Sequence, residues 1–305
     1  MKNHKIIYGI SIIFVLFSLA LASKPLEKFE KTYKTGKTAI LDVSNSSGDV
    51  SVKRGGNEVI VVGLIRAGHS WKMSAYKADE VAKYVKDNPP ITHSGKKVTI
   101  KKIASEDSRV IYIDYEITVP RNTRVSISTG SGDLEVIDVY GPADLSTGSG
   151  DVFIQGVEKG AELSTGSGDI TGKDLASDVS ASTGSGDISM KFSEPADVRA
   201  STGSGDITLD NLEGSLVART GSGNASISGT AADEWKVSTG SGDVDVTLSD
   251  KVGYNVSIKT NSGYIETEPP ITVSGRIKRN EIKGKIRGGG ELVSLSTGSG
   301  DITLK

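Results

Sequence analysis

Hydrophobic and polar residues alternate with a period of two through the long C-terminal part of the chain. Because successive side chains of a strand point to opposite faces, this period predicts short β-strands with one buried face. The inward positions come in sets of two apolar residues and a threonine, such as Val125-Ile127-Thr129. These threonines form a predicted inward ladder: Thr129, Thr147, Thr165, Thr183, Thr202, Thr220, Thr239 and Thr297.

Each threonine belongs to a six-residue sequence that recurs along the chain, STGSGD in seven copies and the variant RTGSGN at 219–224. Intact copies lie at 128–133, 146–151, 164–169, 182–187, 201–206, 238–243 and 296–301. The last residues of successive copies and variants are Asp133, Asp151, Asp169, Asp187, Asp206, Asn224, Asp243 and Tyr264, at steps of 18, 18, 18, 19, 18, 19 and 21 residues. A motif that returns at a fixed period is typical of a solenoid in which each repeat is one coil.

Each unit therefore predicts a short strand, a Gly-Ser-Gly corner, a second strand and a second turn. One unit has only a thin apolar strip, so it is stable only when stacked on neighbours that share its core. The sequence predicts an all-β, single-domain β-solenoid with about 18–19 residues per coil over residues 122–305. Residues 37–121 are expected to form a first coil and an α+β cap with one helix, which Ser74 caps and which runs to about Asp87.

Glycine and aspartate have predicted structural roles at the corner. Glycine permits a turn that side chains would block, and we expect each aspartate to bond the amides of its own turn. Stacked carboxylates about 4.8 Å apart repel one another by about 1 kcal/mol in a water-like dielectric, which solvent and amide hydrogen bonds can offset. The predicted turn ladder consists of Gly132, Gly150, Gly168, Gly186, Gly205, Gly242 and Gly300 with Asp133, Asp151, Asp169, Asp187, Asp206, Asp243 and Asp301.

The first residues predict export. Lys2 and Lys5 precede an apolar run over residues 6–21, and a small-x-small cleavage site ends at Ala22. This pattern indicates a signal peptide over residues 1–22 that is cleaved after Ala22. No second long apolar run follows, so the mature chain is not expected to span a membrane. We expect it in the periplasm, on the cell surface or outside the cell.

The two ends of the predicted rod differ. Residues 23–36 are polar and lysine-rich, which predicts a flexible leader ahead of the cap. At the other end the chain stops one strand after Asp301, so nothing in the sequence covers the last coil. An uncovered strand edge invites pairing with another chain. The sequence therefore allows end-to-end self-association at the C-terminal coil, unless the charges of Asp301 and Lys305 protect the edge.

The order of segments resembles a known family. An early SGD strand, a helix with flanking strands, YEITVPRNTRVSISTGSGDLEV, serial TGSGD coils and the closing GRIKRNEIKGKIRGGGELVSLSTGSGDITL are similar to the bacterial putative-adhesin β-helix family. The resemblance covers roughly residues 37–305 of the chain. It implies a right-handed β-helix, a domain of unknown function and adhesin-like surface binding, and it supplies no catalytic residue.

Composition and repetition weigh against catalysis, metals and nucleic acid. An active site needs a unique cluster, whereas the chain has three histidines and its acidic residues recur as ladders. GSGD resembles the repeat of calcium-binding β-rolls, but Gly and Asp are adjacent here and occur once per coil. A structural turn is favoured over weak calcium binding, and no cofactor or metal site is expected. The net charge of −2 argues against nucleic-acid partners. The absence of cysteine excludes disulfides.

Binding and scaffolding are the remaining hypotheses. The outward serines and their neighbours Asp144, Glu162, Ser180, Arg199 and Lys236 are small and mixed in charge, which permits contact with envelope polysaccharide or a surface protein. Scattered aromatic residues are candidates for stacking on sugars: Tyr140, Phe153, Trp235 and Tyr254. The inward register of Trp235 favours a core position for that residue. The leading hypothesis is an exported, non-enzymatic β-helix protein with adhesin-like binding at the cell envelope. The alternatives are a structural scaffold or envelope-stress-associated protein and, third, a polysaccharide-acting β-helix enzyme.

Overall fold

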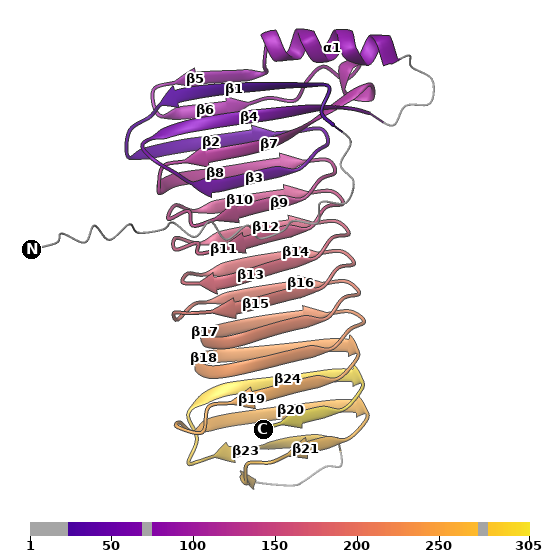
Figure 1. Cartoon of the computed structure of the whole chain (residues 1–305). Helices are drawn as coiled ribbons and strands as arrows, with labels where there is room; N and C mark the ends of the chain where they lie inside the picture. The colour runs from indigo at the N-terminus through magenta and orange to yellow at the C-terminus, as the bar shows by residue number, and fades with distance from the viewer. Residues whose placement is uncertain (1–23, 69–74, 274–279) are drawn as a thin grey trace, which may run out of the picture.

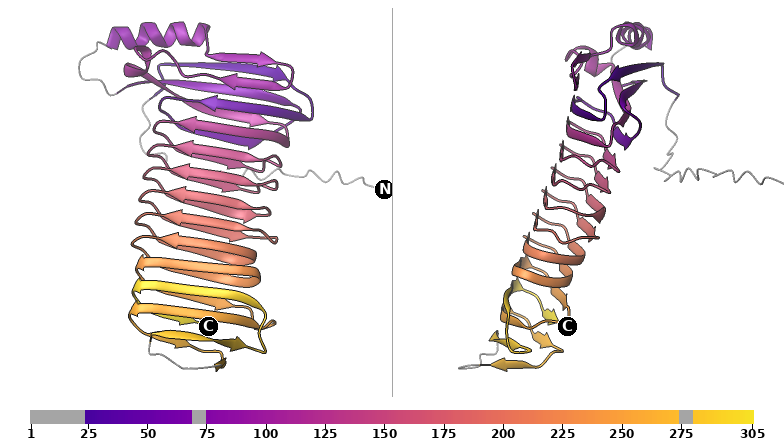
Figure 2. Two further views of the ribbon diagram at one scale, coloured as in Figure 1. Left: turned by 180° about the vertical axis from the view of Figure 1, so that it is seen from behind. Right: turned by 90° about the vertical axis from the view of Figure 1, so that its left-hand side faces the viewer.

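Short β-strands that cross the long axis of a flattened rod make up most of the protein (Figure 1). The structure, a computed structural model, describes residues 24–68, 75–273 and 280–305. The strands stack one above another along the rod, and a view turned by 90° shows a narrow body with strands on two opposite faces (Figure 2). The expected all-β solenoid with one helix is confirmed over the described residues.

Each coil contributes one strand to each face of the rod. Face A consists of the strands that precede the Gly-Ser-Gly corners, and face B consists of the strands that follow them. Along the rod, face A contains β2 (Thr38–Ser44), β8 (Asn122–Thr129), β10 (Ala143–Thr147), β12 (Ala161–Thr165), β14 (Val179–Thr183), β16 (Val198–Thr202), the ends of β17 (Ile207–Thr220) and β18 (Ala225–Ser241), β24 (Glu291–Ser299) and β20 (Tyr254–Ser262).

Face B follows the same order. β17 and β18 run from face B around the second turn into face A, so each contributes to both faces. The strands of face B are β3 (Val50–Arg54), β9 (Leu134–Ile137), β11 (Val152–Gln155), β13 (Ile170–Leu175), β15 (Ile188–Phe192), the starts of β17 and β18, β19 (Val244–Leu248), β25 (Ile302–Leu304) and β21 (Ile265–Thr267).

Successive coils pair in parallel and in register. Thr147, for example, lies opposite Thr129 on one side and Thr165 on the other. Burial alternates along the interior strands as the period of two predicts, so the apolar residues and threonines fill a continuous core. Trp235, which falls in the inward register, is fully buried, and its Nε1 donates to the carbonyl of Gly214 at 2.8 Å.

At the distal end of the rod, the order of coils departs from the order of the chain. The last coil in sequence, β24–β25, lies between two earlier ones, because β24 pairs with β18 and β20 while β25 pairs with β19 and β21. Two short strands, β22 (Ile271–Val273) and β23 (Glu281–Ile286), close this end, where β23 pairs antiparallel with β20. The expectation of an uncovered C-terminal coil that self-associates end to end is therefore wrong, since both of its strands already have two neighbours.

At the proximal end, too, the order of coils along the rod departs from the order of the chain. The coil β2–β3 lies directly on β8–β9, although residues 55–121 intervene in the chain. The intervening residues form the cap beyond that coil: β6 pairs with β2, β7 pairs with β3, and β4 pairs antiparallel with β7. Its elements are β4 (Glu58–Ala67), α1 (Ala75–Asp87), β5 (Ile91–Ser94), β6 (Lys97–Ile100), a 3-10 turn (Asp107–Arg109) and β7 (Ile111–Val119).

The polar segment before the first coil is ordered rather than flexible. Residues Glu27–Lys34 form β1, which pairs antiparallel with β4, so the expected flexible leader over 23–36 is wrong for these residues. Phe29 is buried and packs edge-on to Tyr115, with ring centroids 6.4 Å apart. It fits because its partner, Gly63, has no side chain; a Cβ there would lie 2.2 Å from the phenyl ring. In this segment two aromatic residues, Phe29 and Tyr33, stand among lysines, glutamates and a threonine, and two residues four positions apart do not establish a period of two.

The predicted helix is confirmed as α1 and packs on β1, β4 and β7. Ala78, Ala82 and Val85 are buried on its inner face, and Pro89 and Pro90 follow its end. The expected N-cap at Ser74 lies outside the described residues, as do the predicted signal peptide and its cleavage site at Ala22.

Candidate functional site

The inward threonines join neighbouring coils. Thr165 Oγ1 donates to the carbonyl of Gly150 in the preceding coil at 2.8 Å and accepts the amide of Gly168 in its own corner at 3.1 Å. The same pair of bonds recurs at Thr147, Thr183 and Thr202. All eight threonines of the predicted ladder are buried, at 3–5% exposure. Their hydroxyls are used within the fold and offer nothing to a ligand.

The corner aspartates form a continuous ladder, but not by the expected bonds. Each carboxylate accepts the amide of the next coil rather than an amide of its own turn; Asp151 Oδ1, for example, accepts the amide of Asp169 at 2.8 Å. This bond supplies the attraction that offsets the repulsion between stacked carboxylates. Along the rod the ladder runs through Asp114, Asp49, Asp133, Asp151, Asp169, Asp187, Asp206, Asn224, Asp243, Asp301 and the amide of Tyr264.

The second glycine of each corner is required mainly by stacking. A Cβ at Gly150, Gly168, Gly186 or Gly205 would lie 1.9 Å from the glycine carbonyl of the preceding coil. A positive φ, which also favours glycine, occurs within the predicted set at Gly132, Gly242 and Gly300. The glycines, threonines and aspartates predicted from the repeat thus share one structural corner and do not form a site.

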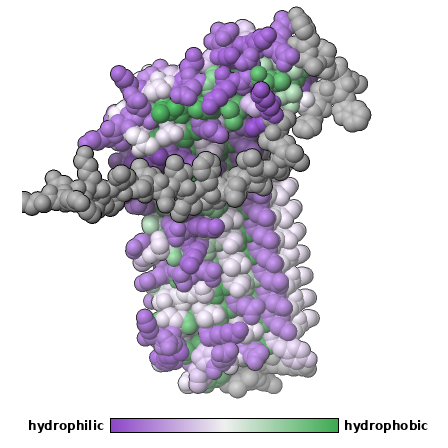
Figure 3. All heavy atoms as spheres, viewed as in Figure 1, coloured by the Kyte–Doolittle hydropathy of each residue, from purple (hydrophilic) through white to green (hydrophobic). Residues whose placement is uncertain are grey.

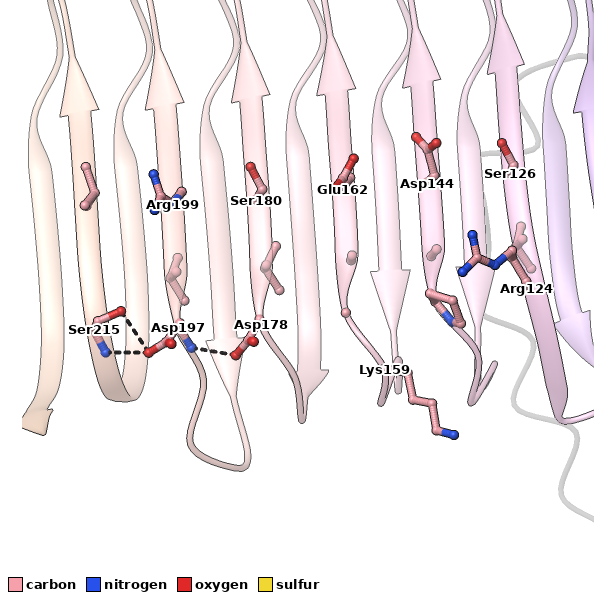
Figure 4. A pocket seen from close by; sticks show the side chains of 18 of the residues that line it. Arg124, Ser126, Asp144, Lys159, Glu162, Asp178, Ser180, Asp197, Arg199 and Ser215 are labelled. Carbon is pink, nitrogen blue, oxygen red and sulfur yellow. Dashed lines mark hydrogen bonds between the residues drawn. The ribbon is translucent and has the colours of Figure 1, made fainter. Parts of the chain in front are cut away.

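A groove of about 730 Å³ runs across the outer side of face A (Figure 4). Its floor is the middle outward position of each strand, where direct neighbours along the rod are Asp42, Ser126, Asp144, Glu162, Ser180, Arg199 and Val217. Four of the five outward residues named from the sequence, all but Lys236, line this groove. The sequence therefore placed these residues on one surface, while the hollow itself was not foreseen.

Asp144 and Glu162 stand side by side on the groove floor. They are Cα partners on β10 and β12, and both are exposed. Neither makes a side-chain hydrogen bond or ion pair with another residue of the described chain, whereas Asp42 pairs with Lys97 at 2.5 Å. Arg199, two coils further along, is likewise exposed and unpaired within the described ranges. The floor thus has an acidic half and a basic position separated by Ser180.

One rim of the groove is a second, shorter ladder that sequence reasoning missed. Asp178 Oδ1 accepts the amide of Asp197 at 2.9 Å, and Asp197 Oδ1 accepts both the amide and the hydroxyl of Ser215, at 3.0 and 2.8 Å (Figure 4). These bonds from Ser215 lower the pKa of the Asp197 carboxyl. The signal in the sequence was a polar residue directly before Val179, Val198 and Leu216.

Of the four aromatic residues considered for sugar stacking, Trp235 and Tyr254 are buried in the core, so the expectation is wrong for them, while Tyr140 and, on face B, Phe153 are contacted by cations. The Arg121 guanidinium lies 4.4 Å from the ring centroid of Tyr140 and the Lys159 ammonium 5.5 Å from it, while Lys173 lies 5.5 Å from the Phe153 ring. Figure 3 shows one broad side of the rod as stripes of hydrophilic and near-neutral residues with narrow hydrophobic bands. Among the described residues, the exposed large hydrophobic side chains lie in the terminal coils and caps: Ile40, Tyr84, Val252, Tyr264 and Leu292.

The described residues offer no recognisable catalytic or metal-binding cluster. No group of three or more histidine, aspartate or glutamate side chains in that part of the chain is arranged to hold a metal ion. Within the same ranges, α1 is too short and polar to cross a bilayer, and no other helix qualifies. The groove lining of face A consists of serine and charged side chains between small apolar ones.

Comparisons with known proteins identify the family of the chain. Residues 41–305 match the family described as Toastrack DUF4097. Among solved structures, the chain is similar to a putative adhesin from Bacteroides fragilis NCTC 9343, with 13% identity, a TM-score of 0.41, and coverage of 92% of this chain and 97% of that one. It is also similar to a putative cell adhesion protein from Clostridium sporogenes ATCC 15579, with 12% identity, a TM-score of 0.24, and coverage of 92% and 99%. No curated protein matches it. Since the family match runs from the first coil to the last residue, the chain belongs to the Toastrack DUF4097 family.

Proposed function

We propose that this chain is an exported, non-enzymatic protein of the cell envelope that binds an extended ligand along face A, in the manner of an adhesin. The observation that carries the proposal is the pair Asp144–Glu162, two unpaired carboxylates on the floor of an uncovered groove. The repeated carboxylates of the interior corners, by contrast, each accept a structural hydrogen bond from the next coil. These two have none, so their position calls for a different explanation.

The fold does not need charges at these positions. Like charges directly opposite each other on neighbouring strands are destabilising, by up to about 1 kcal/mol. The adjacent coils carry Ser126 and Ser180 at the same position, which shows that serine satisfies the register there. A charge pair that costs stability and has an uncharged alternative within the same repeat supports a binding role.

The geometry favours an extended, repeating ligand. The outward rows of face A advance by about 4.8 Å per coil, so a polymer lying along the rod meets a similar surface at each step. The groove is shallow and polar, which suits the hydroxyls of an envelope polysaccharide better than it suits a compact apolar molecule. Such contacts are individually weak, and affinity grows with the number of coils engaged.

The test is cosedimentation of the purified protein with insoluble envelope polysaccharide over a range of concentrations. The informative variant is the triple change Asp144→Ser, Glu162→Ser and Arg199→Ser, which gives the floor the serine of the neighbouring coils. Saturable binding by the wild type and at least tenfold weaker binding by this variant are expected.

A matched control removes the same charges from the opposite face. Asp210→Ser, Asp245→Ser and Lys191→Ser alter exposed outward residues of face B, with the same change in net charge. The control is expected to bind like the wild type. Equal loss in both variants, or no binding by the wild type, would reject face A as the binding surface. A parallel series with a calcium chelator tests the corner aspartates, since loss of binding there would revive the calcium alternative.

A structural scaffold is the second candidate. The aspartate and threonine ladders join all coils from the proximal cap to the distal one, which gives a stiff rod of fixed length. This reading needs no ligand in the groove, so absence of polysaccharide binding combined with an envelope defect in a deletion strain would favour it.

A further inference from the structure

The charged residues of face A are ordered along the rod. On the proximal side of the strand β14 lie Glu162 and then Asp144, one and two coils away. On the distal side lie Arg199 and, on the next coil, Arg219. All four are exposed, and none makes a side-chain hydrogen bond or ion pair within the described chain. At these outward positions face A therefore carries an acidic stretch and a basic stretch that meet at Ser180, while the groove lining on the acidic side also holds the exposed cations Arg124 and Lys159.

This order is self-complementary under a two-fold rotation. If a second copy lies face to face with its rod antiparallel, coils equidistant from Ser180 meet each other. Glu162 then faces Arg199 of the second copy, and Asp144 comes within reach of Arg219 of the second copy. The symmetry repeats each contact, because in an isologous interface residue i meets j and j meets i. In a parallel arrangement the same coils meet, and every one of these contacts joins like charges.

On the rim of the groove the order of charges is reversed, with the cation on the proximal side and the carboxylate on the distal side, and this order also favours the antiparallel orientation. Lys159 lies at the turn of the coil that holds Glu162, and Asp197 lies at the turn of the coil that holds Arg199. Lys159 is exposed, and only Oδ1 of Asp197 is engaged by Ser215, so Oδ2 is available to a cation. The antiparallel rotation brings Lys159 toward Asp197 of the second copy. The charges of the groove floor and those of the rim thus each favour the antiparallel orientation of the two copies.

We infer that the partner of this surface is a second copy of the chain, paired face A to face A in the antiparallel orientation. The outward residues between the charges are serines, such as Ser164, Ser182 and Ser201, so two flat sheets can approach closely. Five coils of five residues cover roughly 400 Å² per copy, about half the area of a stable interface. The association is therefore weak in solution and sensitive to salt, and it strengthens where copies are arrayed on a surface.

This inference rests on the proposed function in using the same surface, but its test is separate. Sedimentation equilibrium of the purified protein, at concentrations up to about 1 mM and at low salt, measures self-association without any other ligand. A monomer–dimer equilibrium that weakens at about 0.5 M salt, where charges are screened, is expected for the wild type. A strictly monomeric wild type overturns the inference, whether or not polysaccharide binds.

Charge reversal identifies the contact. Glu162→Arg alone and Arg199→Glu alone each place like charges at both symmetric contacts, and each is expected to weaken the dimer by about tenfold or more. An equimolar mixture of the two variants, and the double variant Glu162→Arg with Arg199→Glu, both restore opposite charges and are expected to associate like the wild type. Lys191→Glu, on face B, is the control and should change nothing.

Several results contradict this pairing. If the mixture and the double variant stay monomeric, or if the dimer persists in both single variants, the surface is not face A. If the single variants lose polysaccharide binding while the wild type is monomeric, the charges serve the polymer alone, and the second copy is excluded as partner.

Discussion

The backbone amide of Asp133 donates a hydrogen bond of 2.9 Å to the carboxylate of Asp49, 84 residues earlier in the chain. This bond extends the interior ladder into the proximal coil, from which Asp49 in turn donates its amide to Asp114 Oδ1 at 3.0 Å. The ladder ends there in an ion pair, because Arg66 Nε lies 2.6 Å from Asp114 Oδ2 and both side chains are largely buried. The cap thus neutralises the last carboxylate of a row that elsewhere has only amide partners.

Asp49 is expected to make stability depend on pH. Burial raises the pKa of its carboxyl, and the charges of Asp114 and Asp133 add to this effect, while the amide of Asp133 and the charge of Arg66 oppose it. An acid whose pKa is higher in the folded state loses stability as pH rises from its unfolded value, near 4, through its folded value. Asp49→Asn keeps the amide acceptor without the charge. It should match the wild type below about pH 4 and be more stable above that window, by less than about 1 kcal/mol given the solvent exposure.

A second variant tests the sign of that argument. The pKa of Asp197 is lowered by its bonds from Ser215, so the stability it contributes is present above the unfolded value and is lost as pH falls through the folded one. Asp197→Asn is therefore expected to fall below the wild type as pH rises, opposite to Asp49→Asn. Urea unfolding of the three proteins between about pH 3 and pH 7 measures both trends. Two variants that move in the same direction would refute the assignment of these shifts.

The corner glycines provide a test of coil stacking. A Cβ at Gly168 would lie 1.9 Å from the carbonyl oxygen of Gly150, which belongs to the backbone of the preceding coil. Gly168→Ala is expected to lower the free energy of unfolding by about 1–3 kcal/mol, as overpacking of a dense interior does. Gly56→Ala is the matched control because no atom lies within 4 Å of its added Cβ. Chemical denaturation should show a change within about 0.5 kcal/mol for the control.

The interior of the rod could be predicted because every residue there contacts its own counterpart one coil away. Thr165 follows Thr147 by one period in the sequence and is also its strand partner in the next coil. The period of the sequence therefore predicts which residues are in contact. Burial, register and the inward threonines follow from that period. The partner of each aspartate did not follow, because a carboxylate reaches the next coil as easily as its own turn, and only the geometry decides between them.

The ends of the rod could not be predicted for the same reason. Val125 pairs with Leu41 across the 55–121 insertion, and Trp235 pairs with Val293 across the whole distal cap. No periodicity links such residues, since the sequence separation depends on the length of what is inserted. The groove on face A could be predicted only in part. Its outward residues were identified from the sequence. The hollow depends on the side chains of several coils together, so no single repeat carries a pattern that reveals it.

The ladder threonines should tolerate loss of a methyl group better than loss of the hydroxyl. Thr165→Val leaves the carbonyl of Gly150 and the amide of Gly168 without their buried partner, which is expected to cost about 1–3 kcal/mol. Thr165→Ser keeps both bonds and removes one methyl group, at a cost of about 1 kcal/mol. Thermal unfolding of the two variants ranks them, and a valine variant as stable as the serine variant would show that the hydroxyl bonds contribute little.

Deletion of coils distinguishes the interior from the ends. Removing residues 152–169 places Ile170 where Val152 was, and these two residues are direct partners in adjacent coils, so the register of every remaining strand is preserved. The shortened protein is expected to fold with a single cooperative transition, because stability in a stacked repeat is close to a sum over neighbours.

Removing residues 291–305 is expected to behave differently, although it deletes fewer residues. It takes out β24 and β25, which lie between β18–β19 and β20–β21, so two coils that never touched would have to meet across the gap. The linkers connect strands that are separated by an intervening coil, so they oppose this closure. The amides of the distal cap should therefore lose protection from hydrogen exchange, while those of the proximal coils keep it. Hydrogen exchange resolved along the chain measures this directly. Full protection of β20 and β23 after the deletion would mean that the distal cap is stable on its own and that the last coil does not hold it in place.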